Sequence, residues 1–247
     1  MADHVPDQGA EWYLERSDDP TQVAVSLFWT KRAGQVAALA DGGLAGGAAR
    51  AAGHMDGVRE LVRSIFIDAG MPESSIVYEP YLPGFYRARK RWDMAVRYKG
   101  ALVAALEFKS QVGSVGKNIN NRFEEALGTS TDTWAAQTKF AAYGEVPPWL
   151  GYVFVLREDD ETERPDVPID ALFAADPVFK GMSYNQRYQE MLRRFIGDNI
   201  YQAGWFITTK TDDAGRVSYA EPLATASGKA FRAAVEGRVK YVQSVLD

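Results

Sequence analysis

The stretch that decides the fold occupies residues 91–110 and reads RWDMAVRYKGALVAALEFKS. Residues 101–106 are an unbroken apolar run, which predicts a buried strand, and residues 92–97 predict a second strand joined to it around "YKG". The buried strand nevertheless ends in Glu107, Phe108 and Lys109. Because strand side chains alternate between faces, Glu107 and Lys109 are expected to point the same way, and Phe108 into the opposite layer.

The position of Asp93 relative to Glu107 depends on the turn between the two strands. A two-residue loop would place Asp93 opposite Leu106, on the wrong face of the sheet. A three-residue loop over residues 98–100, with Gly100 in the left-handed conformation, would place Asp93 opposite Ala105, with Glu107 as its diagonal neighbour. We therefore predict a bulged turn at Gly100 or an equivalent bulge within the strands.

Two carboxylates beside a lysine suit metal-assisted hydrolysis of a phosphodiester. Asp93 and Glu107 offer the hard oxygen ligands that magnesium prefers, and Lys109 can orient a water and offset developing negative charge. The same residues also fit a simple salt bridge at the strand edge beside an unrelated acid, because an acid followed by Glu-x-Lys often arises by chance. The pattern alone leaves both interpretations open.

Composition excludes several classes of protein. The 247 residues are 46% hydrophobic, which is ample for a packed core, and include no cysteine, so a disulfide framework, a thiolate nucleophile and a zinc-thiolate site are excluded. The net charge of −5 disfavours a nonspecific nucleic-acid coat but leaves room for a local basic groove. The polar N-terminus lacks the features of a signal peptide, and no apolar run approaches membrane-spanning length, which predicts a soluble intracellular protein.

The predicted elements alternate between helices and strands. This order predicts an α/β fold in which helices cover both faces of a mixed sheet, as a single domain over residues 1–247. A polar leader is expected at residues 1–21, and a flexible Gly/Ala-rich loop at residues 41–53. Helices are expected at residues 22–40, 56–69, 122–143, 184–201 and 227–245, and strands at residues 92–97, 101–109, 149–156, 204–210 and 217–222.

Several motifs resemble one family of nucleases. The segments "WD" and "LEFKS", followed by "VGSVGKNINNRFEEALGTSTD" at residues 112–132, closely resemble the XhoI-type restriction endonucleases, a branch of the PD-(D/E)xK nuclease superfamily. The resemblance extends to "MDG" at residues 55–57, "LPGFYR" at residues 82–87 and "PPWLGY" at residues 147–152. It covers residues 54–156 most specifically.

The resemblance implies a fold and an activity. It implies a restriction-endonuclease-like three-layer α/β/α fold, with residues 92–143 forming the catalytic hairpin and the helix after it. It also implies a bacterial cytoplasmic type II enzyme that cuts the palindrome CTCGAG after the first C and leaves four-base 5′ extensions. One or two magnesium ions per site, a homodimer, and a cognate DNA methyltransferase acting on the same site follow from the same likeness.

The resemblance also implies roles for particular residues. Asp93 and Glu107 match the metal-binding acids and Lys109 the lysine of the motif, whereas Trp92 replaces the proline that gives the superfamily its name. The superfamily often adds an acid from an early helix, for which Glu60 and Asp56 are candidates. Helical geometry predicts that Glu60 faces solvent and that Asp56 is an N-cap.

A loop and a basic run are candidates for contacts with DNA. The alternative for the loop is that Asn121 and Glu124 only cap the next helix, and the alternative for the basic run is a solvated strand entry. The candidate DNA contacts are Arg87, Arg89, Lys90, Arg91, Asn118, Asn120, Asn121 and Arg122.

Two other functions fit the same residues. One is a repair or structure-selective nuclease of the same superfamily. The other is a DNA-binding module that keeps the fold without catalysis, against which the complete set of acids and lysine argues.

Overall fold

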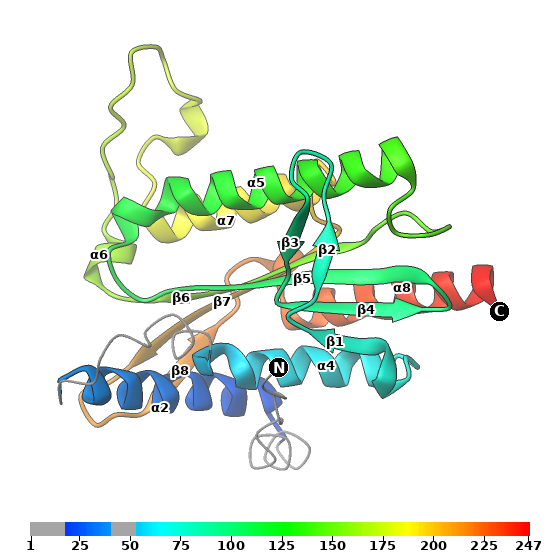
Figure 1. Ribbon diagram of the computed structural model, residues 1–247. Coiled ribbons are helices and arrows are strands. Elements are labelled where there is room, and N and C mark those ends of the chain that lie inside the picture. The colour runs from blue at the N-terminus through cyan, green and yellow to red at the C-terminus, as the bar shows by residue number, and fades with distance from the viewer. Residues whose placement is uncertain (1–17, 41–52) are drawn as a thin grey trace.

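A computed structural model describes residues 18–40 and 53–247 (Figure 1). Most of the predicted leader and of the predicted Gly/Ala-rich loop therefore lies outside the described residues. The helices are α2 Pro20–Ala40, α4 Asp56–Asp68, α5 Val115–Phe140, α6 Asp160–Glu163, α7 Tyr184–Gly197 and α8 Gly228–Leu246. The strands are β1 Ile76–Tyr78, β2 Tyr81–Pro83, β3 Arg89–Arg91, β4 Met94–Tyr98, β5 Ala101–Gln111, β6 Leu150–Arg157, β7 Ala203–Thr211 and β8 Val217–Ala220.

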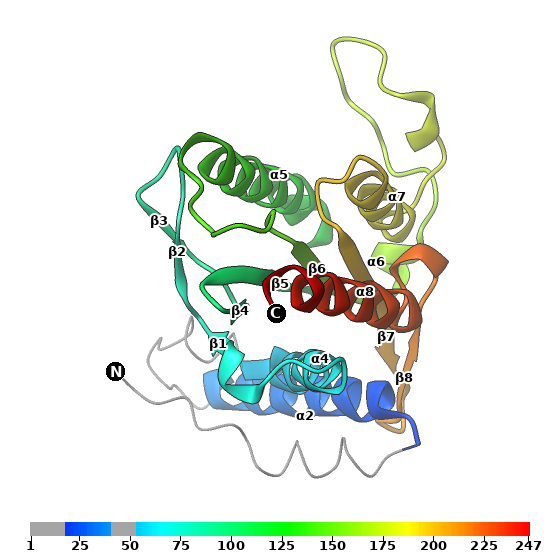
Figure 2. The same cartoon turned by 90° about the vertical axis from the view of Figure 1, so that its right-hand side faces the viewer.

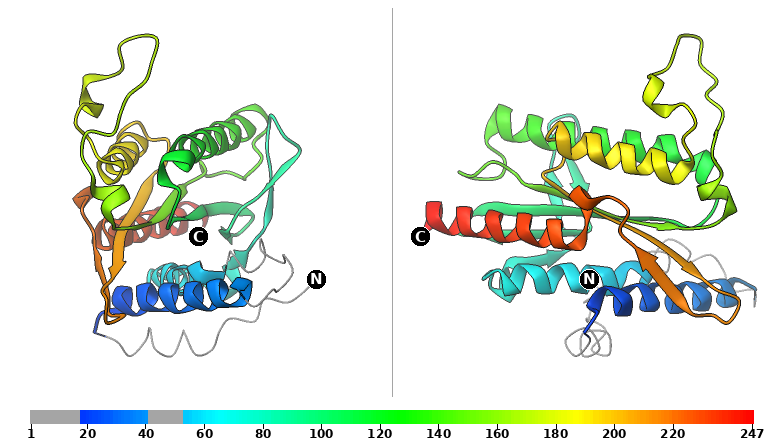
Figure 3. Two further views of the ribbon diagram at one scale, coloured as in Figure 1. Left: turned by 90° about the vertical axis from the view of Figure 1, so that its left-hand side faces the viewer. Right: turned by 180° about the vertical axis from the view of Figure 1, so that it is seen from behind.

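Six strands form one sheet in the order β1-β4-β5-β6-β7-β8. The central pairs β5/β6 and β6/β7 are parallel, and the outer pairs are antiparallel. Helices α5 and α7 cover one face, and α2, α4 and α8 lie on the other (Figures 2 and 3). The predicted α/β class, with a mixed sheet between two helical layers, is confirmed.

The apolar strands build a separate core on each side of the sheet. Val103, Val153 and Ile207 face the layer of α2, α4 and α8, whereas Ala105, Phe154 and Phe206 face the layer of α5 and α7. This burial on both faces explains why the central strands are apolar throughout rather than alternating. Among the described helices, none is both long and apolar enough to cross a membrane.

A bulge in β5 sets the register of the β4–β5 hairpin. The turn contains only Lys99 and Gly100, with φ of 45° and 82°, as a two-residue hairpin requires. The predicted three-residue turn is therefore wrong. Val96 pairs with Ala104 and Arg97 with Leu102, so Val103 has no partner, and the predicted alternative of a bulge within the strands is confirmed. Continuing the register places Asp93 opposite Glu107, not opposite Ala105.

A buried arginine on α8, in the layer of α2, α4 and α8, supports this bulge. Arg238 of α8 donates from Nε to the carbonyl of Val103 at 2.8 Å, and from Nη2 to the carbonyls of Leu102 at 3.2 Å and Pro147 at 2.8 Å. Burial lowers the pKa of Arg238 to about 10, and the side chain forms no ion pair within the described ranges. It satisfies the carbonyls of Leu102 and Val103 at the irregular point of β5, and that of Pro147 before β6.

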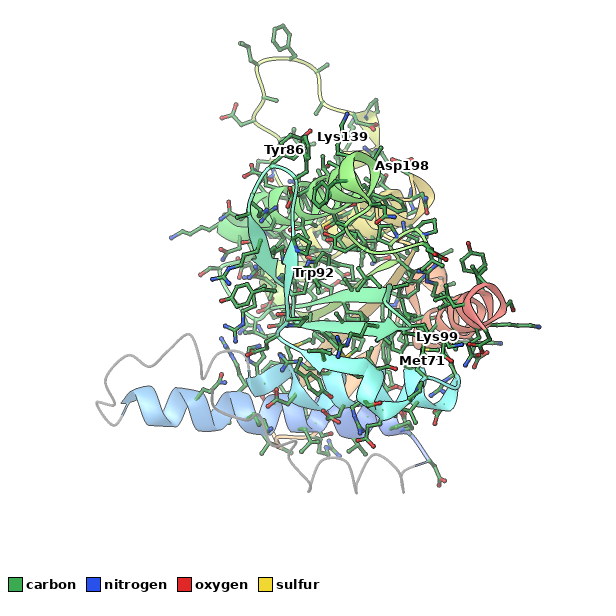
Figure 4. All side chains as sticks on the ribbon, turned by 45° about the vertical axis from the view of Figure 1, so that its right-hand side comes forward. Met71, Tyr86, Trp92, Lys99, Lys139 and Asp198 are labelled. Atoms are coloured by element: carbon green, nitrogen blue, oxygen red, sulfur yellow. The ribbon has the colours of Figure 1, made fainter. Side chains whose placement is uncertain are left out.

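The stretch before β4 forms an arm that the sequence did not predict as strands. Strands β2 and β3 pair as a separate hairpin whose turn rests on α5 (Figure 4 labels Tyr86 at the turn and Trp92 at the base). The Asp132 carboxylate on α5 accepts from the backbone N–H groups of Phe85 and Tyr86 and from Arg87 Nε. This triple acceptance fixes the arm against the helix.

The N-terminal caps of two helices differ from the predictions. Helix α5 begins at Val115 rather than at residue 122, so the expected capping box at Asn121 and Glu124 is wrong. The reason is tertiary: the Glu161 carboxylate on α6 accepts from the N–H of Val115 at 2.9 Å and supplies the cap from a distant segment. In α4, Met55 is the N-cap, and Asp56 makes no side-chain cap hydrogen bond, so the predicted capping role of Asp56 is also wrong.

Candidate active site

Asp93, Glu107 and Lys109 meet at the β4–β5 hairpin. Asp93 directly follows Trp92, which Figure 4 labels at the base of the arm. Lys109 Nζ lies 2.5 Å from Glu107 Oε2 and 3.9 Å from Asp93 Oδ2. The backbone N–H of Phe108 donates to Asp93 Oδ2 at 2.7 Å. The two carboxylates therefore converge on one ammonium group. The register also places Asp93 and Glu107 on the same face of the hairpin, as the sequence predicted.

A second lysine contacts the site from the arm. Lys90 on β3 donates to Glu107 Oε1, so the two oxygens of Glu107 are engaged by two different lysines. The ammonium group of Lys90 also lies 4.7 Å from the centre of the Trp92 ring. Lys90 was predicted as a DNA contact, and its position gives it a direct partner in the candidate site.

Burial and mutual charge change the ionisation of the site. Burial and the neighbouring Glu107 raise the pKa of Asp93 above its ordinary value, against the opposing effects of Lys109, the Phe108 N–H and Arg59. Burial acts to lower the pKa of Lys109, but Glu107 and Asp93 outweigh it and the pKa is raised. Lys109 is therefore held as a cation between two acids.

Two cavities open on either side of Lys109. One, of about 460 Å³, is lined by Asp93, Lys109 and the start of α5; the other, of about 300 Å³, is lined by Glu107, Lys109 and Lys90. Arg122 lines both. The candidate site is thus accessible from two directions rather than closed within the core.

The donor set fits a hard cation that keeps part of its hydration shell. Nowhere in residues 18–40 or 53–247 do three or more His, Cys, Asp or Glu side chains cluster as a ready-made metal cage. Two carboxylates that leave positions for water and a substrate oxygen match magnesium better than zinc or a fully caged calcium. The residues that could hold such an ion are Asp93 and Glu107.

The two additional acids do not join this site. Glu60 is buried, accepts a hydrogen bond from the Tyr78 hydroxyl at 2.5 Å and lies 3.7 Å from Arg63, so the prediction that it faces solvent is wrong. Asp56 pairs with Lys31 at 3.2 Å and with Arg59 at 3.5 Å. Neither acid lines the two cavities beside Lys109.

The other predicted DNA contacts lie around the arm and along α5. Arg87 pairs with Asp132, Arg91 with Glu79, and Arg89 lies over the Tyr81 ring, so the arm carries its basic groups largely at the surface. Asn118, Asn120 and Asn121 belong to the first turns of α5 rather than to a loop. Asn120 and Asn121 are exposed, whereas Asn118 donates to the carbonyl of Ser114.

Two residues near the site were not singled out from the sequence. Arg59 of α4 is only 4% exposed and lines the larger cavity, and Tyr152 of β6 pairs in register with Glu107 and lines the smaller one. The Tyr152 hydroxyl is buried without a hydrogen-bond partner. The sequence of α4 shows only the apolar spacing of an amphipathic helix, and residues 149–156 show only the pattern of a buried strand. Neither pattern indicates that Arg59 or Tyr152 places a polar group beside the site.

The fold and the site together define a class of protein: a mixed sheet between two helical layers, with two acids and a lysine at the end of a central hairpin, as in restriction-endonuclease-like nucleases. The family described as restriction endonuclease XhoI matches residues 32–221. The chain belongs to this family, and the predicted likeness to type II restriction enzymes is confirmed at that level.

Named relatives agree with this assignment. The chain is 33% identical over 184 residues to the type II restriction enzyme BstVI of Geobacillus stearothermophilus, covering 71% of this chain and 82% of the relative. It is 35% identical over 148 residues to the type II restriction enzyme XhoI of Xanthomonas vasicola, covering 58% of this chain and 60% of the relative. It is 38% identical over 141 residues to the type II restriction enzyme AbrI of Azospirillum brasilense, covering 53% of this chain and 63% of the relative. No solved structure matches the chain significantly.

Proposed function

We propose that this protein is a type II restriction endonuclease that cuts both strands of duplex DNA at CTCGAG, after the first C, leaving four-base 5′ extensions. The observation that carries the proposal is the convergence of Asp93 and Glu107 on Lys109 Nζ, at 3.9 and 2.5 Å. Membership of the restriction endonuclease XhoI family supports the substrate class, because the named relatives are type II restriction enzymes. The recognition sequence and the cut position are proposed from the motifs that resemble this family at residues 92–93, 106–110 and 112–132.

In this proposal each residue of the site has a distinct task. Asp93 and Glu107 hold magnesium, one or two ions per site, which when bound withdraws charge from the phosphate and lowers the pKa of a water. Lys109 orients the attacking water and offsets the negative charge that develops around phosphorus. Asp93 is itself oriented by the N–H of Phe108. Hydrolysis then releases the 3′ oxygen and leaves a 5′ phosphate.

Cutting both strands requires two such sites. Each chain carries one set of Asp93, Glu107 and Lys109, and a palindrome has twofold symmetry, so the proposal includes a homodimer. A cognate methyltransferase that modifies the same sequence would protect the DNA of the host, and the enzyme would act in the bacterial cytoplasm.

The test is digestion of a plasmid of known sequence with magnesium, followed by sequencing of the fragment ends. Discrete fragments with ends inside CTCGAG are expected. Discrete fragments at another sequence would contradict the proposed specificity alone. Cutting only at flaps or lesions would favour a repair nuclease, and binding without cutting would favour a non-catalytic module.

A further inference from the structure

The cavity of about 460 Å³ beside Asp93 has a strongly basic lining. Its charged residues are one acid, Asp93, and four cations contributed by four different elements: Arg32 of α2, Arg59 of α4, Lys109 of β5 and Arg122 of α5. These elements come together at the end of the molecule where β5 leads into α5 (Figure 3, left). Such a concentration of positive charge next to a cleavage site is unexpected in a chain of net charge −5.

Arg59 is the most unusual member of this lining. The residue is 4% exposed, and its guanidinium lies 6.0 Å from the centres of the Tyr78 and Phe108 rings, which orient it. One side of the group contacts Asp56 at 3.5 Å, yet Nε is buried without a hydrogen-bond partner. A buried guanidinium with a free donor in the wall of a cavity is a ready site for an anion.

Arg32 adds a second guanidinium from the other side of the cavity. It is half-buried and forms no ion pair or hydrogen bond with any residue in the part of the chain that the structure describes. Lys109 pairs with Glu107, Arg122 with Glu125 at 3.0 Å, and Arg59 with Asp56 at 3.5 Å, so Arg32 is the one cation of this lining without an acidic partner among the described residues. Arg59 keeps an unpartnered Nε, as does Arg122, and the whole guanidinium of Arg32 is available. Arg122 also lines the second cavity, so Arg59 and Arg32 are the guanidinium groups that belong to this cavity alone.

We propose that this cavity binds one phosphate group of the DNA backbone, adjacent to the phosphate that is cut. The guanidinium groups of Arg59 and Arg32 would contact its non-bridging oxygens. Guanidinium groups match the geometry of phosphate oxygens, and Asp93 with Lys109 at the rim places the cavity beside the reacting group. A phosphate anchored there fixes the position of the neighbouring phosphodiester. This assignment rests on the proposed endonuclease function.

The experiment uses duplexes that carry the cleavage site, in which one phosphate at a time is replaced by an uncharged methylphosphonate. The rate constant kcat/KM is measured for the wild type, Arg59→Met and Arg32→Met. At one position other than the cut phosphate, the replacement is expected to slow the wild type about tenfold. Each variant is expected to be slowed about tenfold on unmodified DNA, with little further loss at that same position.

A matched control is Arg232→Met. Arg232 pairs with Asp68 at 3.0 Å, at the opposite end of α4 from Asp56, and it lines neither cavity beside Lys109. This variant should respond to every methylphosphonate as the wild type does. If Arg59→Met does not fold, as judged by its circular dichroism, the half-buried Arg32 carries the test alone.

The outcomes separate this inference from the proposed function. Full additivity of both arginine variants with every methylphosphonate, on DNA that the wild type cuts, would overturn the phosphate site and leave the nuclease assignment intact. A wild type that cuts no DNA would instead overturn the proposed function.

Discussion

Arg238 on α8 and Val103 on β5 are joined by a hydrogen bond of 2.8 Å from Nε to the carbonyl of the one residue that bulges from the β4–β5 hairpin. The bulge brings Asp93 to the position opposite Glu107, because without it the two-residue turn would set Asp93 against Leu106. Arg238, in the helical layer formed by α2, α4 and α8, therefore supports the register that brings Asp93 and Glu107 together.

Replacing Arg238 with methionine is expected to weaken both folding and cleavage. Three backbone carbonyls would lose a buried donor, which predicts a loss of about 1–3 kcal/mol in the free energy of unfolding. Denaturant unfolding measures the first effect and kcat/KM the second. Arg232→Met, on the same helix but at the surface, is the control and should change neither quantity by a comparable amount. Wild-type cleavage by a destabilised Arg238→Met would contradict the role in register.

The pKa of Asp93 predicts a pH-dependent stability for the metal-free protein. Burial and Glu107 raise this pKa, so between the ordinary value of 3.8 and the raised one the folded state binds more protons than the unfolded state. Stability from this group is therefore lost as the pH rises through that window. Asp93→Asn should make the protein more stable than wild type above the window, with the difference vanishing below it.

Thermal unfolding in EDTA across a pH series measures this difference. Asp68→Asn, a surface substitution at the end of α4, is the control. An Asp93→Asn variant that is less stable than the wild type at every pH would show that the hydrogen bond from Phe108 outweighs the cost of the buried charge.

Lys90 and a metal ion are expected to compete for Glu107. Lys90 donates to Oε1 while Lys109 holds Oε2, so a cation that ligates Glu107 must displace at least one ammonium. Lys90→Met keeps an apolar stem against Trp92 and removes the charge, and it should tighten magnesium binding roughly fivefold. Isothermal titration calorimetry measures the affinity directly. Arg91, like Lys90, belongs to β3, but it pairs with Glu79 rather than with Glu107, so Arg91→Met should leave the affinity unchanged.

Elements that depend on local interactions were predictable from the sequence, whereas features that depend on residues distant in the chain were not. The apolar periodicity of α4 and the buried run of β6 are local signals, and both elements formed at the expected positions. The bulge at Val103 could only be posed as an alternative, because its support comes from Arg238, far away in the chain. The start of α5 was misplaced because Glu161 supplies its cap.

Burial by other elements also explains why the environments of Glu60 and Arg59 were not predicted. Glu60 lies opposite the apolar stripe of α4 on a helical wheel, but Tyr78 and Arg63 cover it, so a wheel drawn for one helix could not report its burial. The place of Arg59 in the cavity beside Asp93 could not be predicted either, because residues of β5 and α5 form the other walls of that cavity. The proximity of Asp93, Glu107 and Lys109 was predictable because all three belong to a single hairpin.

The central claim is that Asp93 belongs to the catalytic machinery rather than to a strand-edge salt bridge, and the single-turnover cleavage rate of Asp93→Asn tests it most directly. With magnesium and a duplex that the wild type cuts, the rate is expected to fall by roughly 10³-fold or more. Binding of the same duplex should survive, and Asp68→Asn should cut normally. Cleavage by Asp93→Asn within about tenfold of the wild type would contradict the account.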